Sequence, residues 1–177
     1  MRARTPLVLL AAATVAAGLA PPASAGITHV AVTVTVGALA ITVPTPGVEN
    51  PVNLGSLPGV PGGVIEGSLG QVQVLDNRNS AAGASWVASV ISTAFTPPAG
   101  PTIGAANVGY VAGTITTQGT VTTVANNPTN LVGVVPAVSA SAITGNNSAT
   151  WNPKIRVTVP GGMASGVYTG MITHSVA

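Results

Sequence analysis

Apolar and polar side chains alternate with a period of two in several segments of this chain, and this alternation restricts the fold more than any other feature. Residues 27–36 alternate valine with threonine or alanine, and residues 154–159 alternate apolar with polar side chains. A period of two places successive side chains on opposite faces of a β-strand, so one face of each strand is expected to be buried. The residues that we expect on buried faces are Val30, Val32, Val34, Ile155, Val157, Val159, Ile172 and Val176.

The composition favours the same fold class. The 177 residues include 22 glycines and 15 prolines, and only 5% of the residues are charged. A chain rich in glycine, threonine and valine, with almost no glutamate or lysine, disfavours helices and favours strands and turns. Turn signals recur roughly every 8–12 residues, which is typical of two packed antiparallel sheets. We therefore predict an all-β protein that forms an antiparallel β-sandwich in a single domain.

The N-terminal segment has the pattern of an export signal. Basic residues precede an apolar segment at residues 7–20, and the small residues at 23–25 fit a cleavage site. We expect a signal peptide at residues 1–25 and a domain at residues 26–177. The alternative, an uncleaved membrane anchor, requires a longer apolar segment of roughly 20 residues. No second long apolar run follows, so no membrane span is expected in the mature chain.

Removal of the signal peptide changes the charge balance. Arg2 and Arg4 account for two of the five basic residues, so the mature chain keeps three basic and three acidic residues and is neutral. A neutral chain offers no electrostatic surface for nucleic acid, and none is expected as a partner. The chain contains no cysteine, so its stability must come from a hydrophobic core and not from disulfides.

The same patterns predict individual elements within the domain. The expected strands lie at residues 27–36, 39–43, 71–76 and 154–159, with others led by Trp86, containing Tyr110, and closing the chain around Ile172. We also expect a Pro/Gly-rich surface loop at residues 44–63, a turn at 76–79, a Thr-rich strand pair at 114–124 around Gln118-Gly119, and a loop or edge at 126–136.

Two blocks of sequence resemble a known family. One block, residues 145–177, reads GNNSATWNPKIRVTVPGGMASGVYTGMITHSVA, and the other, residues 69–95, reads LGQVQVLDNRNSAAGASWVASVISTAF. In this order they resemble the WxL-like surface proteins of Gram-positive bacteria, in their actinobacterial variety. With the spacer between them, the resemblance covers roughly residues 27–177. The resemblance implies a secreted protein that associates non-covalently with the cell wall.

The two tryptophans are the first candidate ligand-binding residues. In the family, Trp-x-Leu tripeptides are associated with peptidoglycan binding, whereas Trp86 is followed by Val87-Ala88, and Trp151 lies in a different segment. Each indole can serve as a packing anchor of a core that is poor in aromatic residues, or can stack on sugar rings. We expect Trp86 to lie in the core, and Trp151 to be half exposed at a strand entrance.

Two pairs of charged residues are further candidates. Asp76 and Arg78 are separated by one residue, and they could form an ion pair that stabilises a turn or could contact wall polymer. Lys154 and Arg156 are expected to point outward from one strand, as part of a solvated sheet face or as a contact for teichoic or other anionic polymers.

The residues needed for catalysis or metal binding are scarce. The mature chain offers only Glu49, Glu66 and Asp76 as acids and His29 and His174 as imidazoles. None of these lies in a recognisable catalytic pattern, and two histidines fall short of the three or four ligands of a zinc site. We expect no catalytic residues, no cofactor and no metal. His174 is expected to face the core and to bond a backbone carbonyl.

The sequence thus leads to two hypotheses about function. The first is an exported, non-enzymatic surface protein that binds the cell-wall polymer, chiefly peptidoglycan and with teichoic acid as a second polymer, with other surface proteins as further partners. The alternative is a structural or assembly subunit of a surface polymer, in which sheet edges of neighbouring chains pair.

Overall fold

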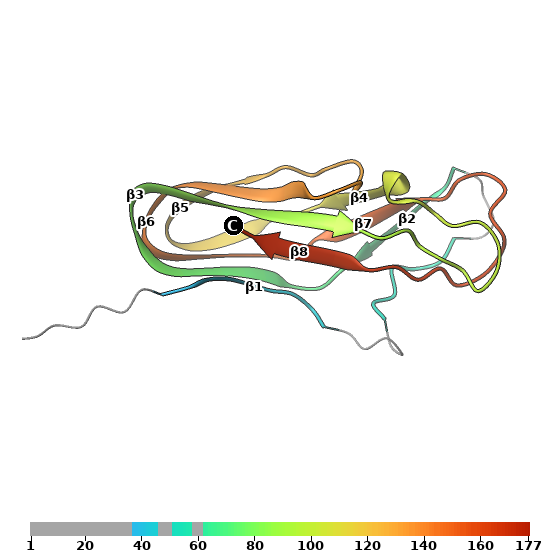
Figure 1. The fold of residues 1–177 in the computed structure, drawn as a ribbon, viewed down its shortest axis with the longest axis horizontal. Coiled ribbons are helices and arrows are strands. Elements are labelled where there is room, and N and C mark those ends of the chain that lie inside the picture. The colour runs from blue at the N-terminus through green and yellow to red at the C-terminus, as the bar shows by residue number, and fades with distance from the viewer. Residues whose placement is uncertain (1–36, 46–50, 58–61) are drawn as a thin grey trace, which may run out of the picture. The chain divides into compact units, whose positions relative to one another are not determined.

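The computed structural model describes residues 37–45, 51–57 and 62–177, which contain eight β-strands and one 3₁₀ helix (Figure 1). The elements are β1 (Leu39–Thr42), β2 (Val64–Ser68), β3 (Val72–Ser92), η1 (Ala105–Asn107), β4 (Val108–Val111), β5 (Ile115–Ala125), β6 (Val135–Trp151), β7 (Lys154–Thr158) and β8 (Ile172–Val176). The predicted signal peptide, the predicted strand at 27–36 with Val30, Val32 and Val34, and the residues His29 and Glu49 lie outside the described residues.

The strands form two antiparallel sheets that pack against each other. The large sheet has the order β1-β3-β6-β5, and β8 also pairs with β3, next to which it is drawn in Figure 1. The small sheet has the order β2-β7-β4. This arrangement confirms the predicted all-β sandwich.

The core lies between the two sheets and consists mainly of valine, alanine and isoleucine around two tryptophans and a tyrosine. Ile155 and Val157 of β7 are buried, as their alternation predicted, whereas Val159 is only partly buried. Ile172 and Val176 of β8 were expected to be buried, and they are partly buried and pack against the core. The incomplete burial follows from the position of β8, which is an edge strand and, among the described strands, pairs only with β3.

The turn predicted at residues 76–79 lies inside β3, which continues through this segment as one long, bent strand. The ladder with β6 pairs Asp76 with Asn147 and then Ser80 with Gly145, so β3 contains two extra residues at this point. Asn79 has a positive φ of 50°, which an asparagine tolerates better than most residues. The Asp and Asn residues therefore form a bulge, next to the place where β3 bends back on itself as one long strand (Figure 1). The small polar residues that precede Trp151, at 145–148, are part of β6.

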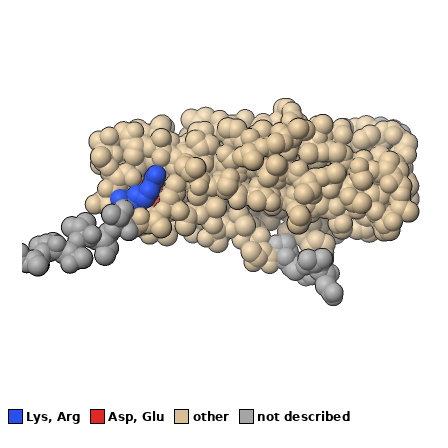
Figure 2. Space-filling view, viewed as in Figure 1, with Lys and Arg blue, Asp and Glu red and all other residues tan. Residues whose placement is uncertain are grey.

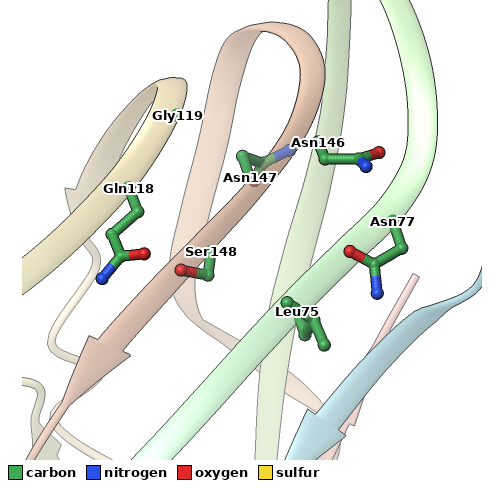
Figure 3. A pocket seen from close by; sticks show the side chains of 7 residues that line it. All are labelled: Leu75, Asn77, Gln118, Gly119, Asn146, Asn147 and Ser148. Atoms are coloured by element: carbon green, nitrogen blue, oxygen red, sulfur yellow. The ribbon is translucent and has the colours of Figure 1, made fainter.

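The strand pair predicted at residues 114–124 is wrong, because β5 is one continuous strand. Gly119 has a φ of 80° and lies so close to β6 that an added Cβ would collide with the carbonyl oxygen of Asn146. The glycine therefore allows two strands to approach closely at the point where β5 bends back, and both halves of β5 pair with β6 (Figure 3). The segment between β5 and β6 is a loop, as the sequence predicted for most of residues 126–136.

Candidate functional site

A buried polar network lies at the bulge of β3. Asp76 is 0% exposed, and its carboxylate accepts hydrogen bonds from Arg78 Nε to Oδ1 at 2.9 Å and from Arg78 Nη2 to Oδ2 at 3.0 Å. The backbone N–H of Arg78 donates to the same Oδ1 at 3.1 Å. Asn147 Nδ2 donates to Asp76 Oδ2 at 3.1 Å, and Trp86 Nε1 donates to Asn147 Oδ1, also at 3.1 Å. The network thus joins two strands of the large sheet through side chains that are sixty or more residues apart.

The electrostatics of this network favour the charged forms of both Asp76 and Arg78. The side-chain hydrogen bond from Arg78 lowers the pKa of Asp76 below its ordinary value of 3.8, against the opposing effect of burial. The same hydrogen bond raises the pKa of Arg78. Arg78 also donates from Nη2 to the carbonyl oxygen of Ser85 at 3.1 Å. The carboxylate has no exposed surface for a ligand, so the Asp76–Arg78 pair stabilises the bulge of β3.

A second buried network surrounds Tyr110 of β4. Trp151 Nε1 donates to Tyr110 Oη at 2.7 Å, and His174 Nε2 lies 3.2 Å from the same oxygen. The rings of Tyr110 and His174 meet edge to face, with centroids 5.6 Å apart. His174 faces the core as predicted, but it bonds a tyrosine hydroxyl where we had expected a backbone carbonyl. Burial lowers the pKa of His174 to about 4 and raises that of Tyr110 well above its ordinary value.

The expectation that Trp151 is half exposed is wrong. Its side chain is 2% exposed, and Trp86 is 1% exposed, as predicted for that residue. Trp151 is the last residue of β6 and lies on the same inward face as Ala149, so its indole enters the core where Tyr110 accepts its N–H. The two tryptophans therefore do not form an aromatic platform for stacking on sugars.

Lys154 and Arg156 point outward from β7, as their alternation predicted. Both contact one carboxylate on the neighbouring strand: Lys154 Nζ lies 3.1 Å from Glu66 Oε1, and Arg156 Nε lies 3.0 Å from Glu66 Oε2. Glu66 and Arg156 are direct cross-strand partners in the ladder of β2 and β7. One acid neutralises one of the two cations, so this face keeps a single excess positive charge.

The outer face of the large sheet carries a site that sequence reasoning missed. A shallow depression of about 240 Å³ lies where β3, β6 and β5 run side by side, and we refer to it as the amide depression. Its lining residues are Leu75, Asn77, Gln118, Gly119, Asn146, Asn147 and Ser148 (Figure 3). The alternation of buried and exposed residues could have indicated this site. Residues that flank the inward Asp76 and Asn147 on their strands must point outward, on the same face of the sheet.

A larger cleft of about 970 Å³ lies between residues 51–57 and residues 160–170. Its lining includes the apolar side chains of Leu54, Ile65 and Phe95, and none of the described residues that line it is charged. The lining also includes the polar side chains of Asn53, Ser56, Ser165, Tyr168 and Thr169, so this cleft is mixed in polarity.

No family model, curated protein or solved structure matches this chain. The resemblance to the WxL-like class therefore stands on the two sequence blocks alone. Within the part of the chain that the structure describes, no group of three or more His, Cys, Asp or Glu residues could hold a metal ion. No helix among the same residues is long and apolar enough to cross a membrane.

The burial of His174 predicts a loss of stability in mild acid. The unfolded chain protonates this imidazole near pH 6.5, whereas the folded chain resists protonation down to about pH 4. The free energy of unfolding should therefore fall as the pH drops below 6.5 and level off near 4, by about 3 kcal/mol in total. Chemical denaturation at a series of pH values measures this change.

The matched control for this experiment is His174→Gln, which keeps a hydrogen-bonding group near Tyr110 and does not titrate. Asp76 is present in both chains, and its lowered pKa places most of the loss of its contribution below pH 3.8, so it does not account for a difference between them. Equal pH dependence of the wild-type chain and the glutamine variant between pH 6.5 and 4 would contradict the prediction.

Proposed function

We propose that this chain is an exported, non-enzymatic surface protein that associates non-covalently with the cell wall through neutral glycan. The export signal and the two family-like sequence blocks support the location. The single observation that carries the choice of ligand is the neutral, hydroxyl- and amide-rich outer face of the large sheet. Hydrogen bonds to such side chains, and not ionic attraction, suit a polyhydroxylated polymer.

The outer face is ordered by strand register. Thr42 of β1, Gln73 of β3, Thr150 of β6 and Thr116 of β5 are successive cross-strand partners, so four polar side chains form one row across the sheet. Within this row, Gln73 Nε2 donates to Thr150 Oγ1 at 3.3 Å. On the face drawn in Figure 2, charged atoms occupy one small area and the remaining described surface is uncharged.

The proposal predicts wall binding that depends little on salt. The mature chain, residues 26–177, should pellet with purified peptidoglycan sacculi, and its affinity should fall by less than about twofold between low and physiological salt. Sacculi with and without teichoic acid should bind it equally. A steep loss with added salt would instead favour the Lys154 and Arg156 face binding an anionic polymer, and absence of pelleting would refute the proposal.

The edge strand β5 favours a second candidate function, assembly into a surface polymer. Among the described residues β5 pairs only with β6, so its other edge is open. This edge contains no proline and no charged residue, the two common devices that prevent strands of neighbouring molecules from pairing. Sedimentation velocity without sacculi separates the candidates: a wall binder stays monomeric, whereas an assembly subunit forms polymers as its concentration rises.

A further inference from the structure

The amide depression brings neutral polar side chains of three strands together. Leu75, Ser148 and Gln118 are successive cross-strand partners of β3, β6 and β5, and Asn77 and Asn146 lie one outward position further along their strands. Figure 3 shows these side chains around the depression. None of the described residues that line it is acidic or basic. Its floor and rim therefore consist of amides, one hydroxyl and one leucine.

Most of these polar groups are free to bind a ligand. Four of the five polar lining side chains point outward, namely Asn77, Gln118, Asn146 and Ser148. Among the described residues, the only side-chain hydrogen bond that these four make runs from the Asn79 backbone N–H to Asn146 Oδ1, at 2.9 Å. The side chains of Asn77, Gln118 and Ser148 make none within the same part of the chain. Together they offer amide donors, amide acceptors and a hydroxyl that can do both. Leu75 is 43% exposed and adds an apolar surface beside them.

The backbone beneath the depression is held rigid by the buried network. Asp76 lies between Leu75 and Asn77, and Asn147 lies between Asn146 and Ser148, so each buried residue fixes its outward neighbours. Asp76 and Asn147 are cross-strand partners and are joined by a side-chain hydrogen bond of 3.1 Å. A site whose supporting side chains are already fixed binds its ligand with a smaller loss of conformational entropy.

We propose that the amide depression binds a neutral, N-acetylated sugar unit of the peptidoglycan glycan strand. This inference rests on the wall association proposed above and names its site. The sugar hydroxyls and the acetamido group exchange hydrogen bonds with Asn77, Gln118 and Ser148. The acetamido methyl group, or the apolar face of the ring, packs on Leu75. The lining residues are uncharged, and so are the hydroxyl and acetamido groups of the sugar that they would contact.

The test compares binding of purified, teichoic-acid-free sacculi by three forms of the mature chain. In the double variant Asn77→Ala/Gln118→Ala, two exposed amides without hydrogen bonds among the described residues are removed, so folding should be unchanged. Affinity should fall by about tenfold or more, because two ligand hydrogen bonds are lost. The matched control, Gln71→Ala, removes an exposed amide that lies outside both the depression and the polar row, and it should change affinity by less than twofold.

A soluble probe identifies the ligand group. An oligomer of N-acetylglucosamine should shift the NMR signals of Gln118 and Ser148, whereas a glucose oligomer of the same length should bind several-fold more weakly because it lacks the acetamido group. If the double variant does not fold, Gln118→Glu keeps the side-chain size, removes the amide donor, and should also weaken binding.

The outcomes separate this site from the proposed function. A wild-type chain that fails to pellet with sacculi refutes both. A wild-type chain that pellets, with a folded double variant of equal affinity, overturns the site and leaves wall association to another surface. A glucose oligomer that binds as tightly as the N-acetylated one overturns the assignment of the acetamido group.

Discussion

Replacement of Asp76 by alanine should lower the free energy of unfolding by about 3 kcal/mol. The variant leaves the Arg78 guanidinium without its carboxylate and deprives Asn147 Nδ2 of its buried acceptor. Removing one partner of a buried ion pair typically destabilises by about 3–5 kcal/mol, and the lower figure applies because Arg78 is 33% exposed and can turn toward water. Urea denaturation monitored by tryptophan fluorescence measures the change.

Glu66→Ala is the matched control for this prediction. It also removes a carboxylate from an ion pair, but Glu66 and both of its basic partners are exposed. Exposed pairs contribute about 0–1 kcal/mol, so this variant should lie close to wild type. Equal destabilisation by the two alanine variants would show that the burial of Asp76 does not have the predicted effect.

The sequence predicted those parts of the fold that depend on local alternation. The period of two in β7 placed Ile155 and Val157 inward and Lys154 and Arg156 outward, and the structure agrees. Residues 39–43 contain β1, which ends at Thr42. The strand β2 was missed, because Val64–Ser68 follows a Pro/Gly-rich segment and includes a glycine that disfavours a strand prediction.

The long strands could not be read from local signals. Asp76, Asn79 and Gly119 have the residue types of turns, yet each lies at or beside a bulge inside a ladder. Whether such residues open a hairpin between two strands that pair with each other, or bend one long strand back on itself, depends on the partner strand, which is far away in the sequence. The same long-range pairing brings Asn146 and Ser148 beside Gln118, and for this reason the amide depression escaped prediction.

Both tryptophans should prove to be structural, with Trp86 the more sensitive to substitution. Truncation of a buried tryptophan to alanine costs about 3–5 kcal/mol, a large share of the roughly 5–15 kcal/mol that stabilises a domain. Trp86→Ala also removes the donor to Asn147 Oδ1 and so opens the network around Asp76. We therefore expect this variant to be unfolded or nearly so in thermal denaturation followed by circular dichroism.

Trp151→Phe tests the other indole while keeping most of its apolar volume. It removes the 2.7 Å hydrogen bond from Trp151 Nε1 to Tyr110 Oη. Because His174 Nε2 still lies beside this oxygen, the free energy of unfolding should fall by only about 1 kcal/mol. Its binding to sacculi should equal that of the wild-type chain, because a side chain that is 2% exposed cannot stack on sugar. The fluorescence of Trp86 in this variant and of Trp151 in Trp86→Phe should be equally resistant to acrylamide. Strong quenching of Trp151 by acrylamide would contradict this prediction, and so would a loss of wall binding in Trp151→Phe without a loss of stability. Either result would show that the Trp151 indole is accessible and can stack on sugar.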